Sequence, residues 1–397
     1  LTCLEYLRGT KTWEQRKFGE ITNRYEEPVS TPHDGYYRLG IRSHAKGTFH
    51  SYVAKGKELE TAQMHRVAAG KFIVNITFGW EHAVAITSED DAGKLVSHRF
   101  PQFSFVEGMV PEFFRYVIVD EKFRHHLWLA SPGGAGRNRV LKIDEMLNYS
   151  MSFPSREEQI RIAKFFASID NLITLHQRKY DKLLNIKKSM LEKMFHKNGN
   201  DVPEIRFKGF TDAWEQRKLG DLYTERNEQG DNSLQILSVS IHTGVSDGEL
   251  TADGLGKKVH RSEDKSTYKH VYAGDLIFNM MRAWQGAIGV AKNEGMTSPA
   301  YISAIPNHEV YPPFMNYLLR RKDAINQINN LSYGVTDFRK RLYWNSFIRV
   351  TCQLPCVAEQ KRIAEVFETI DNLITLHQRK LEKLKNIKKS MLEKMFV

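Results

Sequence analysis

Two long segments of the chain share apolar positions that recur three and four residues apart. Residues 158–195 contain no Gly or Pro, and the second segment, residues 359–396, keeps the same spacing. The periodic positions are Ile162, Phe166, Ile169, Ile173, His176, Tyr180, Leu183, Ile186, Met190 and Met194, then Ile363, Val366, Ile370, Ile374, His377, Leu381, Leu384, Ile387, Met391 and Met395. Because this spacing over about five heptads is typical of a coiled-coil seam, we predict two helices, each about 57 Å long at 1.5 Å per residue.

Shorter patterns between these segments predict two mixed domains. Residues 70–86 have the order turn, strand, Gly-containing turn and strand, and residues 274–290 repeat this order. Phe113–Val119 and Phe314–Asn329 have helical spacing. We therefore expect each domain to be of the α/β (α+β) class.

The chain is a tandem duplication. Residues 158–195 and 359–396 are identical at 30 of 38 positions at an offset of 201, which also relates Trp13–Lys17 to Trp214–Lys218. We expect two copies of one domain, joined by two long antiparallel coiled-coil helices with pseudo-twofold symmetry. The predicted boundaries are a first domain at 1–154, a central helix at 155–197, a second domain at 198–355 with a linker at 198–212, and a final helix at 356–397.

The positive charge of the chain is concentrated in the two helical segments. The net charge is +11, of which residues 158–195 carry +4 and residues 359–396 carry +3. Lys187-Lys188 and Lys388-Lys389 form polar faces that either contact solvent or bind a partner or DNA backbone. The domains are nearly balanced, so DNA recognition there would depend on a few well-placed residues.

Composition excludes several classes of protein. No stretch approaches the ~18 apolar residues of a membrane helix, three Cys do not make a disulfide framework, and 41% hydrophobic residues exclude global disorder. We expect a cytoplasmic protein without contact to a membrane.

Sequence signatures of catalysis are missing. There is no phosphate-binding G-x-x-x-x-G-K-[ST], and Asp120-Glu121-Lys122 and Glu263-Asp264-Lys265 do not align between the repeats. Tyr311-Pro312-Pro313-Phe314 lacks the first Asn, Asp or Ser that an adenine methyltransferase needs. The repeat mates of Cys352 and Cys356 are not metal ligands. We therefore expect no catalytic, cofactor-binding or metal-binding residue, and a self-sufficient nuclease or methyltransferase has no motif to support it.

Polar and basic residues gather at matching turns of the two domains. Arg, Asn and Gln side chains can read base edges in the major groove, although a single loop Arg is usually only solvated. Trp80 and Trp284 are more typical of turn packing, and His176 and His377 of helix packing, than of direct contact with a ligand. The DNA-binding candidates are Trp80, His82, His98, Arg99, Arg137, Asn138, Arg139, Asn279, Arg282, Gln285, Thr336, Arg339, Lys340 and Arg341.

Several motifs together resemble the specificity (S) subunit of bacterial type I restriction–modification systems. Val202–Phe210 followed by Trp214–Asp221 resembles the motif that opens a domain in this family. The motifs that open its conserved helices are matched by Pro154 with Glu158–Ala163, Asp170-Asn171-Leu172-Ile173, Pro355 with Glu359–Ala364, and Asp371-Asn372-Leu373-Ile374. Leu1–Thr10 departs from the domain-opening pattern.

The resemblance implies a non-catalytic recognition subunit. Each variable domain would be a target-recognition domain that reads one half of a bipartite double-stranded DNA site. Two modification subunits would bring S-adenosylmethionine for adenine-N6 methylation, and restriction (motor/nuclease) subunits would bring ATP and Mg²⁺ for DNA cleavage.

In this family the paired helices set the spacing between half-sites and dock the modification subunits. The other hypothesis from the residues is a coiled-coil protein scaffold without sequence-specific DNA binding. The docking or spacer candidates are Ile169, Ile173, His176, Tyr180, Leu183, Lys187, Ile370, Ile374, His377, Leu381, Leu384 and Lys388.

Overall fold

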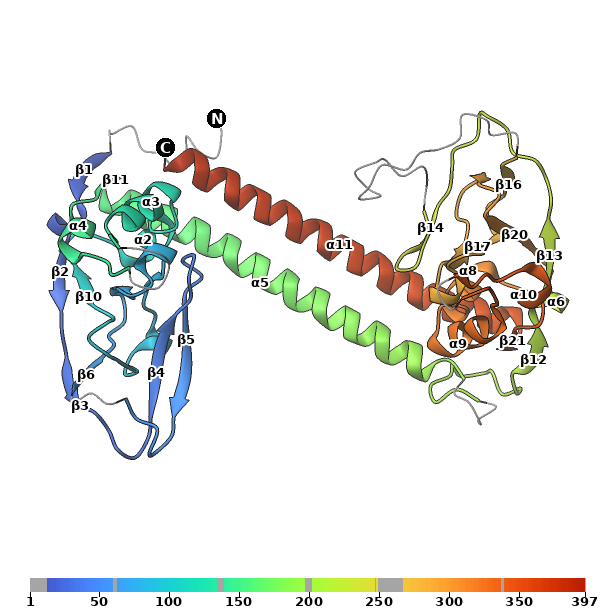
Figure 1. The fold of residues 1–397 in the computed structure, drawn as a ribbon, viewed down its shortest axis with the longest axis horizontal. Helices are drawn as coiled ribbons and strands as arrows, with labels where there is room; N and C mark the ends of the chain where they lie inside the picture. Colours follow the sequence, from blue (N-terminus) through green and yellow to red (C-terminus); the bar gives the residue numbers. More distant parts are fainter. Residues whose placement is uncertain are drawn as a thin grey trace. The chain divides into compact units, whose positions relative to one another are not determined.

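The chain divides into two compact units (Figure 1). The computed structural model describes residues 13–59, 63–133, 139–196, 202–246, 248, 267–336 and 339–396. Unit 1 comprises Leu1–Gln177 and Arg379–Val397, and unit 2 comprises Arg178–Gln378. Each unit therefore contains one globular domain and a part of each of the two long helices, α5 (Arg156–Lys193) and α11 (Val357–Met395).

The centre of unit 1 is a four-stranded antiparallel sheet in the order β2–β10–β7–β8. Successive residues of β7 face opposite sides, since Phe72 and Val74 join the helix-side core and Ile73 joins a second cluster with Leu39 and Ile41. Both faces of this strand are thus covered. The strands are β2 (Thr22–Tyr25), β10 (Gln102–Phe105), β7 (Phe72–Val74) and β8 (Val84–Ile86).

A five-stranded sheet in the order β3–β6–β9–β4–β5 completes the strand layers of unit 1. All its pairs are antiparallel except β4 with β9, and β4 pairs with β5 over six residues as a hairpin. Its strands are β3 (Pro28–Ser30), β6 (Gln63–Arg66), β9 (Leu95–Val96), β4 (Tyr36–Ile41) and β5 (Thr48–Val53).

Short helices and a small ladder close the core of unit 1. Proline stands in the first turn of α2, where its missing N–H costs nothing. Phe113, Phe114 and Phe123 are fully buried, and each such ring stabilises the fold by about 1.5–3 kcal/mol. The elements are α2 (Pro111–Val117), α3 (Glu121–Leu129), α4 (Ile143–Leu147), the 3-10 helices η1 (Phe18–Glu20), η2 (Gly79–Glu81) and η3 (Glu89–Asp91), and the antiparallel pair β1 (Glu14–Lys17) and β11 (Ser150–Phe153).

Unit 2 has the same central sheet, in the order β13–β20–β17–β18, with the same alternation along β17. The elements of this part are β12 (Glu215–Lys218) paired with β21 (Thr351–Leu354), α6 (Leu219–Leu222), β13 (Tyr223–Arg226), β17 (Leu276–Asn279), η4 (Ala283–Gln285), β18 (Ile288–Val290), β20 (Tyr301–Pro306), α8 (Pro312–Leu318), α9 (Lys322–Leu331) and α10 (Trp344–Phe347).

Outside that sheet the two units differ. Where unit 1 has its five-stranded sheet, the described part of unit 2 has two small antiparallel pairs. These are β14 (Val239–Ser240) with β15 (Gly244–Val245), and β16 (Lys269–Val271) with β19 (Gly295–Thr297). The predicted single helix at Phe314–Asn329 is wrong: α8 ends before Leu319, and Arg321 is extended before α9 begins.

The ends of the long helices form part of the domain cores. Ile162, Phe166 and Ile169 of α5 lie in the core of unit 1 together with Met395 of α11. In unit 2 the corresponding residues Ile363 and Phe367 lie in the core with Met194 and Phe195 of α5. In each unit, therefore, the two helices are anchored in the same core as the globular domain.

Three positions of the predicted apolar stripe are corrected by the structure. Ile186 and Ile387 are exposed, and Lys187 and Lys388 take the half-buried positions, because the covered face runs through residues 183, 187, 190 and 194 and their repeat mates. Phe367, rather than Val366, belongs to the covered stripe, because Phe367 is fully buried and lies four residues after Ile363.

Candidate nucleic-acid interface

The turn between β17 and β18 in unit 2 is held by two of its own side chains. The Asn279 side-chain oxygen accepts the Met281 N–H at 2.9 Å, and the indole N–H of Trp284 donates to the Met281 carbonyl at 2.9 Å. Gly286 then reverses the chain at φ 105°. Asn279 is buried and builds the turn, whereas Arg282 and Gln285 are exposed on it.

Unit 1 builds the same turn from partly different residues. Asn75 accepts the Thr77 N–H at 3.0 Å, and the Trp80 indole donates to the Thr77 carbonyl at 3.2 Å. His82 occupies the left-handed position of Gly286, with φ 61°. Its buried ring bonds the Ile118 carbonyl at 2.7 Å, and burial lowers the pKa of His82. Trp80 and His82 thus stabilise the turn.

The second predicted cluster of unit 2 lies directly beside this turn. The Leu342 N–H donates to the Met280 carbonyl at 2.8 Å, which joins the loop before α10 to the turn. Tyr333 and Arg341 pair through both backbone groups, at 3.1 and 2.9 Å. Residues 337 and 338 lie outside the described part of this loop. Its candidates Thr336, Arg339 and Arg341 are exposed, and Lys340 is half-buried.

In unit 1, the backbone of Ile76 joins two of the segments that carry candidates. The Ile76 N–H donates to the Arg99 carbonyl at 3.0 Å, and the Ile76 carbonyl accepts the Leu141 N–H at 2.9 Å. His98 and Arg99 are exposed, and the guanidinium of Arg139 lies 4.7 Å from the ring centre of Trp128. Arg137 and Asn138 lie outside the described residues. Segments far apart in sequence therefore meet at one edge of each domain.

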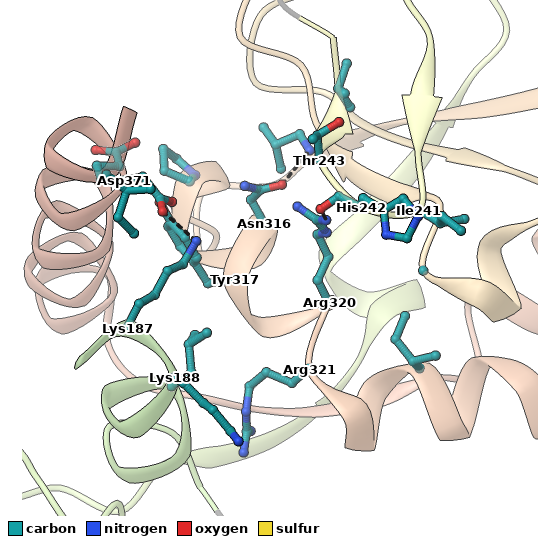
Figure 2. A pocket seen from close by; sticks show the side chains of 18 of the residues that line it. Lys187, Lys188, Ile241, His242, Thr243, Asn316, Tyr317, Arg320, Arg321 and Asp371 are labelled. Carbon is teal, nitrogen blue, oxygen red and sulfur yellow. Dashed lines mark hydrogen bonds and ion pairs between the residues drawn. The ribbon is translucent and has the colours of Figure 1, made fainter. Parts of the chain in front are cut away.

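A groove of about 1380 Å³ extends from the unit 2 turn (Figure 2). It is lined by Gln285 and Gly286 at the turn and reaches Lys187 and Lys188 of α5. Figure 2 shows Arg320 directed at the His242 carbonyl, to which its guanidinium donates. At offset 201 the residues that match Arg320, Arg321 and Lys322 are Val119, Asp120 and Glu121, so this part of the basic lining is not repeated in the first domain.

Each domain is also tied to the two long helices by a Tyr–Asp–Lys triad. In unit 2, Asp371 accepts the Tyr317 hydroxyl at 2.9 Å and the Lys187 ammonium at 2.5 Å (Figure 2). In unit 1, Asp170 accepts the hydroxyl of Tyr116 at 3.2 Å and the ammonium of Lys388 at 2.6 Å. The triads give Asp170 and Asp371, in the predicted D-N-L-I motifs, a structural role.

The ammonium of each triad also lies over its tyrosine ring. Lys187 is 5.6 Å from the ring centre of Tyr317, and Lys388 is 5.5 Å from that of Tyr116. Burial and then the neighbouring carboxylate raise the pKa of both tyrosines, so both hydroxyls stay protonated donors. The repeat of Tyr116 as Tyr317 at offset 201 was a sequence signal for these triads that the motif search missed.

A buried Gln locks the start of each long helix. Gln159 accepts the Val110 N–H at 3.0 Å and donates to the Pro154 carbonyl at 2.9 Å. Gln360 accepts the Tyr311 N–H at 2.8 Å and donates to Pro355 at 2.8 Å. These bonds join each helix start to α2 or α8 and explain the Pro and Gln of the predicted helix-opening motif.

The Glu before each Gln is buried too, but its partner differs between the units. Glu158 accepts the indole N–H of Trp13 at 3.3 Å. Glu359 instead forms a bidentate pair with Arg206, both bonds at 2.8 Å. The indole N–H of Trp214, the repeat mate of Trp13, is buried without a hydrogen-bond partner among the described residues.

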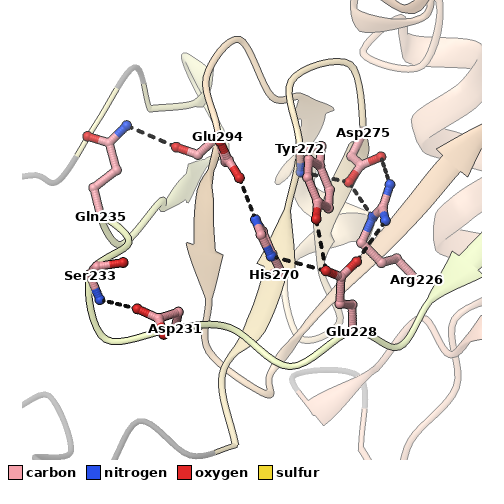
Figure 3. A network of polar contacts seen from close by, with 9 residues as sticks. All are labelled: Arg226, Glu228, Asp231, Ser233, Gln235, His270, Tyr272, Asp275 and Glu294. Atoms are coloured by element: carbon pink, nitrogen blue, oxygen red, sulfur yellow. Dashed lines mark hydrogen bonds and ion pairs between the residues drawn. The ribbon is translucent and has the colours of Figure 1, made fainter.

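A polar network fastens β16 to the central sheet of unit 2 (Figure 3). Arg226 pairs with Asp275 at 2.7 and 3.0 Å, and Glu228 accepts the Tyr272 hydroxyl at 2.8 Å. The His270 ring lies between Glu228 and Glu294, at 3.3 and 2.8 Å. These groups pair mainly with one another, so we assign the network a supporting role.

One feature of the described residues bears on metal binding and another on thiol chemistry. No group of three or more His, Cys, Asp or Glu among them is arranged to hold a metal ion. Burial raises the pKa of the Cys352 thiol to about 12, so this thiol is a poor nucleophile. None of the helices in the described ranges is long and apolar enough to span a bilayer.

Comparisons with known proteins point to a family of DNA specificity subunits. Residues 211–386 match the family model of the type I restriction modification DNA specificity domain. The chain is similar to the specificity subunit of type I restriction enzyme MjaVIII from Methanocaldococcus jannaschii, with 24% identity over 302 residues that cover 70% of this chain and 68% of the relative.

A solved structure supports the fold. The chain is similar to the type I restriction–modification system S subunit from M. genitalium, with a TM-score of 0.59 and 12% identity over 100% of this chain and 99% of that one. At this identity the match bears on the fold alone.

Proposed function

We propose that the chain is a DNA specificity subunit of the type I restriction–modification family, which its residues 211–386 match, and that its two domains divide the recognition of DNA. Each domain reads one half of a bipartite double-stranded site, using the polar edge at its central turn. The match to a DNA specificity domain favours this function over a protein scaffold that does not recognise DNA.

One observation carries the proposal: the two domains share the backbone of the turn but present different side chains on it. Asn75 and Asn279 cap the turn in the same way. On the turn itself, Arg282 and Gln285 of unit 2 are exposed, whereas unit 1 has exposed Phe78 and half-buried Glu81 at the matching positions. His98 and Arg99 are exposed beside the unit 1 turn. Bidentate Arg or Gln contacts discriminate a base by about 1–3 kcal/mol, so such a change of side chains alters the sequence that is read.

The long helices act as the spacer between half-sites and as the docking surface for modification subunits. We propose that α5 and α11 pair as an antiparallel coiled coil with pseudo-twofold symmetry at offset 201. The anchoring of the helix ends in the domain cores and the two triads support this role. Removing two whole turns from both helices should shorten the gap in the recognised site, whereas an unchanged gap would exclude the spacer role.

The chemistry of the complex is assigned to other subunits. This chain would bind DNA, two modification subunits and the restriction subunits without holding a cofactor of its own. S-adenosylmethionine would bind the modification subunits for adenine-N6 methylation, and ATP and Mg²⁺ the restriction subunits, in the bacterial cytoplasm. The purified chain alone should neither methylate nor cleave DNA.

Methylation mapping tests the function. A bacterial host that expresses this chain with its modification subunits should gain N6-methyladenine in one motif of two blocks separated by a fixed gap. A host that expresses the modification subunits without this chain is the control and should lack the motif. Identical methylation in both hosts would contradict the proposed function.

A further inference from the structure

The β4–β5 hairpin of unit 1 and the residues that follow it are basic and contain no carboxylate side chain. Residues 36–57 contain five Lys or Arg and no Asp or Glu. At its tip, residues 42–47, the side chains of Arg42, His44 and Lys46 alternate along the loop and are all exposed. None of these three was a candidate from the sequence, because the hairpin has no recognisable repeat mate.

The hairpin tip is joined to the candidate DNA-reading turn. The backbone N–H groups of His44 and Ala45 donate to the carbonyls of Glu81 and His82, both at 2.8 Å. The Ser43 hydroxyl also donates to the Glu81 carboxylate at 2.5 Å. The tip and the turn at η2 therefore form one continuous surface of unit 1.

Backbone strain is concentrated at this junction. His44, Ala45 and His82 have φ of 62°, 49° and 61°, and they are the three non-Gly residues with positive φ in the described ranges. Such conformations cost of order 1 kcal/mol or more each and cluster at functional sites. All three lie at the contact between the tip and the turn, and the hydrogen bonds of that contact keep the strained backbone in place.

The base of the tip is rigid. Buried Asp91 accepts hydrogen bonds from Thr48 and His50, both at 2.8 Å. The Arg42 guanidinium lies 5.3 Å from the ring centre of Phe49. The same ring covers Gly40, where an added Cβ would lie 2.3 Å from it. A pre-organised loop loses little conformational entropy when it binds a ligand.

We propose that the hairpin tip, residues 42–47, binds phosphate groups of the DNA backbone beside the half-site that the first domain reads. The inference rests on the proposed function and extends it. A basic loop without carboxylates suits a polyanion, and its attachment to the turn places it beside the bases being read. Lys46 is the clearest probe, because Arg42 also supports the loop by donating to the Thr48 carbonyl.

The test measures binding of the assembled complex of this chain and its modification subunits to duplexes that carry the mapped motif. Affinity is determined by fluorescence anisotropy between about 50 and 200 mM salt, where each phosphate contact contributes about 0.9 to the slope of log K against log salt. Lys46→Ala should lower that slope by about 0.9 and weaken binding about threefold to tenfold. The methylated motif should stay unchanged, because phosphate contacts carry no base information.

Two matched variants isolate the location of the charge. Lys46→Arg keeps the charge and should keep the slope. Lys55→Ala removes one exposed charge beyond the opposite end of β5 and should change the affinity less than about twofold. An unchanged slope in Lys46→Ala, or an equal loss in Lys55→Ala, would overturn the proposal.

Failure of this inference differs from failure of the proposed function. Weaker assembly with modification subunits at an unchanged slope would make the tip a protein contact and would also overturn the proposal. If the wild-type complex shows no sequence preference, the proposed function fails first and the inference falls with it. If the complex recognises a specific motif but Lys46→Ala leaves the slope of log K against log salt unchanged, only this inference is overturned and the proposed function stands.

Discussion

The attachments of the two domains to the long helices are the same, whereas their candidate reading edges are not. Both triads use Tyr, Asp and Lys, and both helix starts are locked by a Gln. The turns share an Asn cap and a Trp, yet expose different side chains. The comparison shows that the contacts between domain and helices can stay constant while the exposed side chains of the turn change. A subunit that selects DNA sequences requires this combination.

The largest expected difference between the units lies at the start of the long helices. Glu359→Ala would leave the mostly buried Arg206 without its bidentate partner, and breaking such a pair costs about 3–5 kcal/mol. Glu158→Ala removes one bond from an indole and should cost about 1–2 kcal/mol. Hydrogen exchange of each unit measures both losses. Equal losses of stability in the two variants would mean that the pair between Arg206 and Glu359 does not stabilise the start of α11.

Removal of the tyrosine hydroxyl from either triad should destabilise its unit by the same amount. Tyr116→Phe and Tyr317→Phe each remove one hydrogen bond to a carboxylate, which contributes about 1.5–3 kcal/mol. The free energy of unfolding of each unit should fall by the same amount within about 0.5 kcal/mol. If the free energy of unfolding fell clearly in one unit only, the two triads would not be equivalent.

The pH dependence of stability should differ between the units because His82 matches Gly286. Burial lowers the pKa of His82, so its imidazole is protonated less readily in the folded state than in the unfolded chain. Its contribution to stability is full above the unfolded pKa of about 6.5 and is lost as pH falls from there towards the folded pKa. The slope is at most about 1.4 kcal/mol per pH unit.

Thermal unfolding of the wild type and His82→Gly between pH 7.5 and 5 measures this effect. Glycine tolerates the left-handed backbone at this position. The variant should therefore lose the pH dependence that is due to this ring. An unchanged pH profile would show that His82 is not the group responsible.

The smallest predicted effect concerns the strained hairpin tip. Ala45→Gly relieves a positive φ of 49° and should stabilise unit 1 by about 0.5–1 kcal/mol. Ala54→Gly, just after β5, is a control that should not stabilise. A destabilised Ala45→Gly would mean that the left-handed backbone at Ala45 is not strained.

Local patterns predicted the elements that carry the site. The alternation around residues 70–86 and 274–290 indicated both strand pairs and the turn between them, which the structure has as β7–β8 and β17–β18. The helical spacing also indicated α5 and α11. Each of these patterns is local, because a helix or strand that buries one face has apolar residues at a regular spacing.

Long-range partners could not be predicted in the same way. Asp170 meets a lysine 218 residues further along the chain, and Arg206 meets Glu359 across 153 residues. No spacing rule relates such pairs. The stripe through Lys187 and Lys388 was misassigned to Ile186 and Ile387 for the same reason, because these lysines occupy covered positions beside Asp371 and Asp170, which are far away in the sequence.

The most direct test of the central claim compares methylation maps for two single variants in matching loops. Arg339→Ala changes the exposed loop of the second domain, and Arg139→Ala changes the corresponding loop of the first. The account predicts that each variant relaxes base preference, by about 1–3 kcal/mol at the position it reads, in one block of the motif, and that the two blocks differ. Relaxation of both blocks by either variant, or of the same block by both, would contradict it.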